Sequence, residues 1–382
     1  MRKLTMKQDR ELRNNIKQIR TRLGLSQQDL AQVAGVSRQA ISGVESGQYA
    51  PSATVALRLA KALGCRVEDL FWLDNDETMI EAFPTSTVPI AQPFRLTLAQ
   101  VGSKLIAYPL IKDDAFRTEI IAADGEGWRD TEDSTIKVKL WREPEVLNHT
   151  VVIAGCTPVL SLWANVAQRW YPDLRVYWSF ANSMDALHRL ARGEVHIAGV
   201  HLYDPASNSY NESFAKKVLS NHSAVLINLG IWEEGLLVQP GNPKQIKTIT
   251  QLADSHLKII NRESGSGSRQ LLEHLLQEAQ ISPTQVQGFD QIVNSHVAVA
   301  QAIASGAVDA GVSTRALATA FELEFIPLQK TRYDLVTFEE YLQHPPVQQM
   351  LNILGHHRLH SQLVALGGYD TSQTGEIVAR ID

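Results

Sequence analysis

Cysteine is scarce in this sequence, which has only Cys65 and Cys156, far apart along the chain. Two separated thiols suit a reducing compartment, and they cannot form a zinc site by themselves. The longest apolar runs fall well short of the roughly 18 residues that span a membrane. The first residues, MRKLTMKQDRELRNN, lack the apolar core of a signal peptide. We therefore expect a cytoplasmic protein with no membrane contact.

Sequence motifs of several enzyme classes are also missing. Neither GxSxG nor HExxH occurs. The cluster of His356, His357 and His360 matches no metal-binding spacing and is more typical of a solvated helix end. We predict that the protein is not an enzyme and that it binds no metal. The catalytic alternative is an acid–base or nucleophile set formed by Cys156, His201, Asp204 and His296.

The chain of 382 residues is long enough for two or three domains with sizeable cores. Hydrophobic residues make up 44% of it and charged residues 20%, which is typical of a globular protein. The charge is unevenly divided. Residues 1–75 hold 12 Lys and Arg against 7 Asp and Glu, whereas the other 307 residues hold 24 against 34. A basic N-terminal module on an acidic body is typical of a small DNA-binding domain.

Short amphipathic segments, separated by glycine or by helix-capping residues, fill the N-terminal module. Gly35, Gly47 and Gly64 each follow such a segment, and Ser26 and Ser37 precede two of them. Serine caps the start of a helix, and glycine favours its end. The pattern predicts four short helices, at residues 14–22, 27–35, 38–47 and 54–64.

The residues between Leu23 and Cys65 resemble the phage-repressor (Cro-type, XRE) helix-turn-helix family nearly position by position. The matching motifs are Ser26–Ala31, Val36-Ser37, Ile41-Ser42, Glu45–Gly47 and Leu59–Leu63. The resemblance implies a DNA-binding domain over residues 1–75, whose recognition helix, Ser37–Ser46, lies in the major groove. The DNA contacts that it implies are Gln27, Gln28, Ser37, Arg38, Gln39 and Ser42.

One such helix reads only a few base pairs, so we expect a homodimer on double-stranded operator DNA. The alternative is a helical interaction module that binds no DNA.

Residues 76–93 are rich in Thr, Pro and acidic residues, which predicts a linker. Residues 94–145 are then expected to form a small β connector, with a hairpin turn at Gly102-Ser103. Its β-leaning runs are Phe94–Leu98, Lys104–Tyr108, Glu119–Ala122 and Ile136–Leu140. Nothing in the connector indicates catalytic chemistry.

Strand and helix patterns alternate through residues 146–382. Buried strands are indicated at residues 150–156, 174–178 and 195–200. The tract ALHRLARGEVHIAGV is echoed by VAQAIASGAVDAGVS at an offset of 113 residues, and the apolar run Ala224–Gln239 between them suits a crossover strand. Alternation with short turns predicts parallel doubly wound sheets, and the echo predicts two similar lobes.

The turn Ser264–Ser268 stands between an apolar strand pattern and a helix pattern. Such a turn presents backbone N–H groups, hydroxyls and the positive end of a helix dipole to one point. An ordinary strand–turn–helix joint is the alternative. Similar helix starts occur at Gly155–Thr157, Asn182-Ser183 and Ser295-His296. Because ligands bind beyond the carboxyl ends of strands in such sheets, we expect these starts to surround a small oxyanion or a phosphate-bearing ligand.

The large domain resembles the periplasmic-binding-protein-like ligand domain that occurs inside cells, behind helix-turn-helix heads or at the end of some molybdenum-cofactor biosynthesis proteins. The motifs that carry the resemblance are Ala154–Pro158, His201–Asp204, Asn261–Arg269, Ser295–Ala300, Val308–Gly311 and Phe325–Asp334. The resemblance implies a two-lobed α/β fold and a molybdate, tungstate or molybdenum-cofactor-like ligand. The predicted ligand residues are Cys156, Thr157, Ser183, His201, Asp204, Arg262, Ser264, Ser266, Gly267, Ser268, Arg269, Ser295, His296 and Tyr333.

Together these features predict an all-α helix-turn-helix head, a small β connector and an α/β two-lobed domain. We expect a ligand-responsive transcription regulator that requires no cofactor and has molybdate, tungstate or another small anion as its effector. The alternative is an accessory binding or storage protein of molybdenum-cofactor metabolism, in which the helix-turn-helix domain is a docking module.

Overall fold

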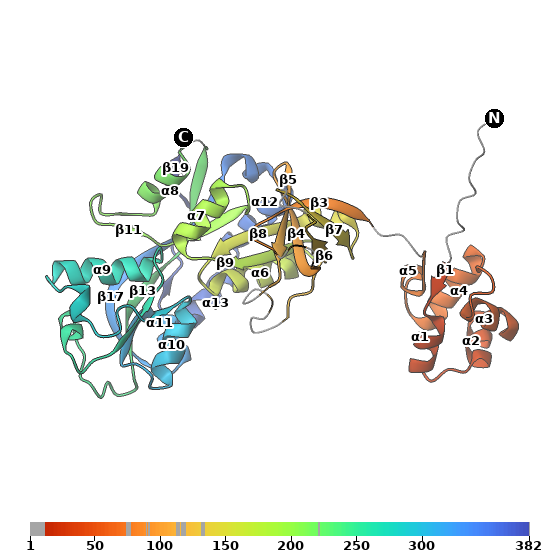
Figure 1. Cartoon of the computed structure of the whole chain (residues 1–382), viewed down its shortest axis with the longest axis horizontal. Helices are drawn as coiled ribbons and strands as arrows, with labels where there is room; N and C mark the ends of the chain where they lie inside the picture. Colours follow the sequence, from red (N-terminus) through yellow and green to blue (C-terminus); the bar gives the residue numbers. More distant parts are fainter. Residues whose placement is uncertain are drawn as a thin grey trace. The chain divides into compact units, whose positions relative to one another are not determined.

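The structure is a computed structural model that describes residues 12–73, 78–88, 90, 92–111, 115, 120–130, 134–220 and 222–381. The chain divides into two compact units, Met1–Met79 and Ile80–Asp382 (Figure 1). Within the described residues, no helix has the length and apolar character needed to cross a membrane.

The described part of the N-terminal unit consists of short helices and one two-stranded sheet. The helices are α1 (Ile16–Arg22), α2 (Gln27–Ala34), α3 (Arg38–Glu45), α4 (Ala53–Leu63) and α5 (Val67–Leu70). Strand β1 (Leu12–Asn14) pairs antiparallel with β2 (Phe71–Leu73). The four predicted helices are present, and their apolar faces share one core. The sheet was not predicted, because its strands are three residues long and far apart in sequence.

Helix ends in this unit follow the signals in the sequence. The Ser26 hydroxyl accepts from the backbone N–H of Asp29, and the Asp29 carboxylate accepts from the N–H of Ser26, which completes a capping box. Gly35 ends α2 with a φ of 65°, a conformation that favours glycine. The Ser37 hydroxyl then accepts from the N–H of Ala40 at 3.1 Å. Helix α3 therefore starts immediately after a tight turn.

The second unit begins with a small closed barrel of strands in the order β3-β5-β4-β6-β7. The strands are β3 (Met79–Pro84), β4 (Phe94–Val101), β5 (Lys104–Pro109), β6 (Gly125–Trp128) and β7 (Ile136–Leu140). Part of the predicted linker is therefore a strand, since β3 pairs with β5 and buries Ala82. The pairing of β3 with β5 joins distant segments, so the composition of residues 76–93 did not indicate it.

One strand of the barrel differs from its predicted position. Residues 120–122 are not in a strand, and Glu119 lies outside the described residues. The strand in this part of the chain is β6, which begins later, at Gly125. Gly125 and Gly127 weaken the sequence signal for a β-strand at these positions. At Gly125 a Cβ would lie 2.4 Å from the Lys139 carbonyl oxygen, so glycine is needed there, and at Gly127 it would lie 2.5 Å from the Leu96 side chain.

A ten-stranded sheet organises the rest of this unit, in the order β15-β14-β16-β13-β17-β10-β8-β9, with β18 and β19 beside β13. Its strands are β8 (Thr150–Gly155), β9 (Arg175–Phe180), β10 (Ile197–Val200), β13 (Ala224–Val238), β14 (Ile259–Arg262), β15 (Ile292–Val293), β16 (Ala310–Thr314), β17 (Glu324–Phe338), β18 (Tyr369–Asp370) and β19 (Ile377–Ile381). A separate pair is formed by β11 (Tyr203–Asp204) and β12 (Ser209–Tyr210).

The sheet belongs to two lobes (Figure 1). Strands β8, β9 and β10 pair in parallel in the first lobe, and β14, β15 and β16 do so in the second. The long strands β13 and β17 pair antiparallel with each other and connect the lobes. The two-lobed α/β prediction is confirmed, and β13 is the predicted crossover strand. The parallel description holds within each lobe but not for β13 and β17.

Helices pack against both lobes. The first lobe has α6 (Val159–Trp170), α7 (Ser183–Ala191), α8 (Glu212–Val218), α12 (Pro345–Asn352) and α13 (His357–Leu366). The second has α9 (Gly267–Glu278), α10 (His296–Ala304) and α11 (Arg315–Ala320). The internal echo corresponds to α7–β10 and α10–β16, whose connecting turns carry Gly193 and Gly306 with φ of 67° and 74°. Equivalent elements of the two lobes thus share one sequence pattern.

Candidate functional site

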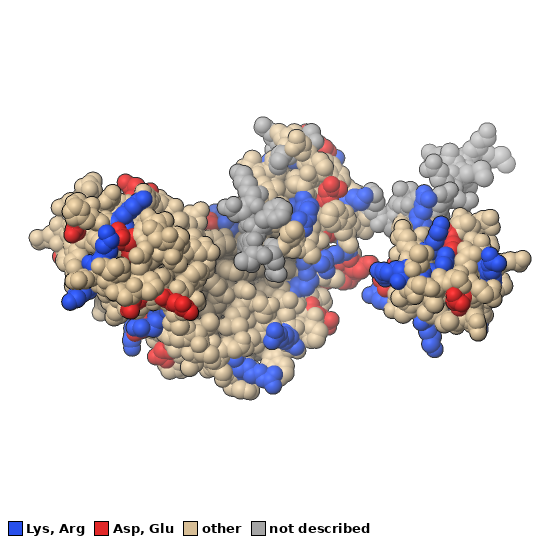
Figure 2. Space-filling view, turned by 90° about the horizontal axis from the view of Figure 1, so that it is seen from below, with Lys and Arg blue, Asp and Glu red and all other residues tan. Residues whose placement is uncertain are grey.

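The predicted DNA contacts lie on α2, on α3 and at the start of α3. Five of them are exposed, namely Gln28, Ser37, Arg38, Gln39 and Ser42. Gln27 is half-buried, and its amide donates to Glu45 at 2.8 Å. Glu45 is also bonded by the Arg20 guanidinium at 2.6 Å, so Gln27 belongs to an internal network. Basic side chains are spread over the visible face of this unit (Figure 2).

In the second unit, the helix starts singled out in the sequence meet between the lobes. The Asn182 amide, at the start of α7, donates to the Ser264 carbonyl before α9 at 3.3 Å. The N–H of Met184 donates to the Gly265 carbonyl at 3.2 Å. The N-cap of α7 is Asn182, whose side chain accepts from the N–H of Asp185, and Ser183 is the first residue of the helix. Hydrogen bonds thus join the first lobe to the second at this point.

Ser183 has a different role from capping. Its hydroxyl accepts from the N–H of His201 at 3.1 Å and so holds the segment after β10 against α7. On the other side of His201, Gly267 lies so close that a Cβ would be 1.9 Å from the His201 carbonyl oxygen. Glycine at 267 is therefore what allows the start of α9 to touch the first lobe.

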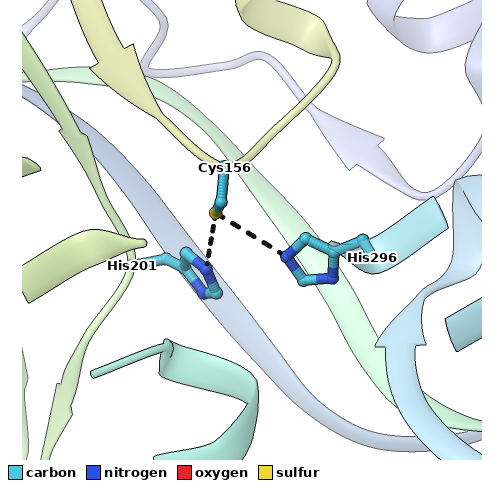
Figure 3. A group of neighbouring side chains, drawn as sticks. All are labelled: Cys156, His201 and His296. Carbon is cyan, nitrogen blue, oxygen red and sulfur yellow. Dashed lines mark hydrogen bonds between the residues drawn. The ribbon is translucent and has the colours of Figure 1, made fainter. Parts of the chain in front are cut away.

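Three buried side chains point toward one another at the centre of this contact (Figure 3). Cys156 follows β8, His201 follows β10 and His296 is the first residue of α10. The Cys156 Sγ lies 3.3 Å from His201 Nε2 and 3.8 Å from His296 Nε2. Each of the three residues is only 1% exposed. The group therefore combines two side chains of the first lobe with one of the second.

A buried carboxylate stands behind this group. Glu234 of β13 accepts from the Ser268 hydroxyl at 2.5 Å and from the Thr331 hydroxyl at 3.0 Å. Its Oε2 lies 3.6 Å from His201 Nδ1. On the other side, His296 Nδ1 lies 3.4 Å from the Ser313 hydroxyl. Both imidazole rings thus have an oxygen atom near the nitrogen that faces away from Cys156.

The charges in this cluster depend on one another. Burial acts to lower the pKa of His201, but the adjacent Cys156 sulfur and Glu234 carboxylate raise it to about 10. Burial acts to raise the pKa of Glu234, but His201 and two hydroxyl donors bring it below its usual range. Burial, with Arg262 and His201 nearby, lowers the pKa of His296 well below its usual value. The cluster therefore contains a buried ion pair beside a neutral imidazole.

Buried donors without partners lie in the same region. The Arg262 side chain is 1% exposed, and two of its nitrogens bond the Glu263 carboxylate at 2.8 and 2.9 Å. Within the described chain, its Nη1 has no hydrogen-bond partner, and neither has Nε1 of Trp232, whose ring lies 5.0 Å from that of His201. Unpaired buried donors are costly, so a ligand that accepts from them would be stabilised.

The other predicted ligand residues are distributed unevenly. Thr157, Ser266 and Tyr333 are buried, and Tyr333 packs on Gly155 and Gly199. Ser266 caps α9 through the N–H of Arg269, and Ser295 caps α10 through the N–H of Ala298. Ser264 is exposed, the Arg269 side chain pairs with Glu273 at 2.8 Å, and the Asp204 carboxylate bonds its own turn at Ala206 and Ser207. These last three are not brought into the cluster.

Glu234, Trp232 and Ser313 belong to the cluster but were not singled out in the sequence. Glu234 stands in the run INLGIWEEGLLV, where an acidic residue in an apolar strand is unusual. A charged residue in such a run must find a partner if it faces inward. That signal could have identified Glu234, whereas Trp232 and Ser313 look like ordinary strand residues.

Two family models match the chain. A helix-turn-helix model matches residues 16–70, and a model described as a PBP superfamily domain matches residues 164–355. The protein is thus a helix-turn-helix domain of the phage-repressor type fused to a two-lobed α/β domain. The chain belongs to the PBP superfamily.

Parts of the chain are similar to known proteins. The uncharacterized protein YvgK of Bacillus subtilis (strain 168) is 34% identical over 199 residues, which cover 52% of this chain and 64% of that relative. The HTH-type transcriptional regulator YgzD of the same organism, itself uncharacterized, is 40% identical over 65 residues, 17% of this chain and 98% of the relative. Among solved structures, the CcmR regulatory domain of Synechocystis PCC6803 in complex with 2-PG has 18% identity and a TM-score of 0.43, covering 56% of this chain and 96% of that one.

Proposed function

We propose that the protein is a DNA-binding transcription regulator whose C-terminal domain senses a small polar or anionic ligand. The observation that carries the proposal is the buried polar cluster between the lobes, on the same chain as a helix-turn-helix domain. The exposed side chains of Arg38, Gln39 and Ser42 on α3 suit contact with base edges and phosphates. The protein is proposed to act in the cytoplasm as a homodimer on operator DNA, because one recognition helix reads few base pairs.

The ligand is proposed to accept hydrogen bonds. Arg262 Nη1 and Trp232 Nε1 are donors without partners in the described chain, and Arg262 is cationic. The start of α9, a helix of 12 residues, adds the positive end of a dipole beside Ser266 and Ser268. These features favour an oxyanion. Molybdate or tungstate is the particular oxyanion that the family resemblance implies, and we propose both as the first to be tested.

Binding rather than catalysis is the proposed role of the site. Of the acid–base or nucleophile set considered above, Cys156, His201 and His296 meet, whereas the Asp204 carboxylate is bonded within its own turn and lies outside the cluster. Ligand binding would favour the closed arrangement of the lobes and so bias the arrangement of paired DNA-binding domains.

Thermal unfolding of the full-length chain tests the ligand proposal. Molybdate, tungstate, sulfate and phosphate would each be added in excess. A true ligand at about 100 times its dissociation constant stabilises by roughly 2.7 kcal/mol, a shift of a few degrees. Replacing Ser266 and Ser268 by leucine should abolish the shift, whereas Ser305→Leu, at an exposed position, should keep it. No shift with any of the four anions would refute the oxyanion proposal.

The accessory or storage role remains the rival to the regulator. A gel-shift titration with promoter DNA from the protein's own gene neighbourhood separates the two. Binding with a specific footprint supports the regulator. A protein that binds its anion but no DNA, in a folded state, would favour the accessory role.

A further inference from the structure

The group of Cys156, His201 and His296 has the composition of a transition-metal site. Its three donor atoms, one sulfur and two imidazole nitrogens, all lie within 4.8 Å of one another and are buried. Thiolate with imidazole is a donor set that suits Zn²⁺ and other borderline-soft ions, and it is a poor set for Mg²⁺ or Ca²⁺.

The spacing of the donor atoms fits one ion between them. Zinc–sulfur and zinc–nitrogen bonds of about 2.3 and 2.0–2.1 Å, at a tetrahedral angle, place sulfur about 3.5 Å from each nitrogen. The observed separations from Cys156 Sγ are 3.3 Å to His201 and 3.8 Å to His296, on either side of that value. The same geometry places the two imidazole nitrogens about 3.3 Å apart, and here they lie within 4.8 Å of each other, so metal binding requires the rings to move.

The imidazole rings are also oriented as metal ligands usually are. In both, Nε2 faces the shared centre, and Nδ1 faces an oxygen atom. Glu234 Oε2 lies 3.6 Å from His201 Nδ1, and Ser313 Oγ lies 3.4 Å from His296 Nδ1. A carboxylate or hydroxyl behind a ligating histidine fixes its tautomer and orientation in metal sites.

From this geometry we propose that Cys156, His201 and His296 bind one borderline-soft transition-metal ion, such as Zn²⁺, between the two lobes. Three protein ligands leave a fourth coordination position of a tetrahedral ion open to an exogenous ligand. The metal then joins the first lobe to the second. The proposal adds a metal to the proposed ligand site. It rests on the proposed function only in taking this contact between the lobes as the place where the ligand is sensed. It replaces the sequence-based prediction that the protein binds no metal.

All three residues are among the predicted ligand residues, but their spacing in the sequence does not indicate a metal site. Cys156 and His201 are separated by 45 positions, and Cys156 and His296 by 140. Zinc motifs readable from sequence have ligands only a few residues apart. Here the fold supplies the proximity, by ending β8 and β10 beside the start of α10.

Titration of the chelator-treated, full-length chain with Co²⁺ tests the proposal, because Co²⁺ bound to thiolate gives a charge-transfer absorption in the near ultraviolet. We expect one equivalent to bind with that absorption and Zn²⁺ to displace it. Cys156→Ser should remove the absorption. Cys65→Ser is the matched control, since Cys65 is the only other cysteine, and it should keep the absorption.

Further variants keep the test decisive if Cys156→Ser does not fold. His296→Gln should abolish or strongly weaken binding, whereas His256→Gln, at an exposed histidine, should not. Ser313→Ala keeps all three ligands and should weaken Co²⁺ binding about 10- to 100-fold through His296 alone. Absence of the charge-transfer absorption in the wild-type chain, or its persistence in a folded Cys156→Ser variant, would overturn the proposal.

The metal test and the regulator test fail independently. Co²⁺ binding without any DNA binding would leave the metal site standing and refute the regulator. Specific DNA binding without Co²⁺ binding would do the reverse.

Discussion

Glu234 illustrates how much one buried side chain can connect. It joins Ser268 of the second lobe to Thr331 of β17, and it faces the charged ring of His201 in the first lobe. The neighbouring Glu233 differs only in its surroundings, since it is partly exposed and pairs with Arg315. The two adjacent carboxylates therefore allow a matched comparison.

Glu234→Ala should destabilise the fold by about 3–5 kcal/mol, because it removes one of the two groups that stabilise the charge of His201 and leaves the Ser268 and Thr331 hydroxyls without their acceptor. Glu233→Ala should cost less than about 1 kcal/mol, as expected for a surface ion pair. Urea unfolding of both variants measures the difference. Equal losses in the two variants would contradict a central role for Glu234.

His196 makes the stability depend on pH. It is 1% exposed, its Nδ1 accepts from the N–H of Val152 at 3.0 Å, and its ring stacks on that of His344 and meets Tyr341 edge-on. Burial, together with His344, lowers the pKa of His196 to about 3. Between that value and its ordinary pKa of about 6.5, the unfolded chain binds more protons than the folded one, so the folded state loses stability as the pH falls.

The loss should approach about 1.4 kcal/mol per pH unit below about pH 6. His196→Gln should reduce the slope by its own share and leave that of His296, whose pKa is also lowered, whereas His256→Gln should leave the slope unchanged. Free energies of unfolding at several pH values between neutral and acidic give the slopes. Parallel slopes for wild type and His196→Gln would show that another group is responsible.

Arg38 is the exposed basic side chain at the first position of α3. Arg38→Ala should weaken specific DNA binding by about 1–3 kcal/mol, the value of a bidentate contact to guanine, without changing the thermal stability. Arg66→Ala removes the same charge elsewhere on the domain and should reduce affinity less. Gel-shift titrations measure both. Equal losses of DNA affinity in the two variants would show that Arg38 contributes only its charge and makes no specific contact.

At the scale of elements, short stretches of sequence predicted the helices and strands that interactions between neighbouring residues determine. Serine and glycine at the helix ends predicted α2, α3 and α4. The pattern of apolar residues predicted β8, α6 and β13. Pairings between distant segments were not predictable in this way. The small sheet β1–β2, the entry of β3 into the barrel and the antiparallel pairing of β13 with β17 all depend on contacts that no local window contains.

In the candidate site, too, local features could be predicted from the sequence and long-range contacts could not. The helix starts near Cys156, Ser183, Ser266 and His296 could be identified, because caps and turns are local. Their assembly around Glu234 could not be predicted, because it depends on how β13 runs between the two lobes. Asp204 and Arg269 lie outside the cluster for a related reason: each finds a partner in its own turn or helix, and sequence does not show which way a side chain faces.

The close approach of α9 to the first lobe is a property of elements, and it yields a prediction. Gly267→Ala places a methyl group against the His201 carbonyl and should force the lobes apart or cost about 1–3 kcal/mol. Amide hydrogen exchange near His201 and at the start of α9 should accelerate. Gly355→Ala, where a Cβ meets nothing within 4 Å, is the control. Unchanged exchange in Gly267→Ala would contradict a tight lobe contact.

At the scale of the whole molecule, a helix-turn-helix domain is joined to a domain whose two lobes meet at buried polar residues. The head carries exposed polar side chains on α3, and the two-lobed domain carries unpartnered buried donors beside a potential metal group. Such a chain is useful as a regulator only if the ligand alters the affinity for DNA. Coupling of this kind is typically worth about 1–3 kcal/mol.

The most direct test is therefore the affinity of the full-length chain for an operator selected from random DNA, measured by fluorescence anisotropy with and without saturating molybdate, tungstate, phosphate or sulfate. The account predicts specific binding that at least one of these anions changes by about 5- to 150-fold, with the change lost when Ser266 and Ser268 are replaced by leucine. Failure to select any specific sequence, or an affinity that none of the anions alters, would contradict it.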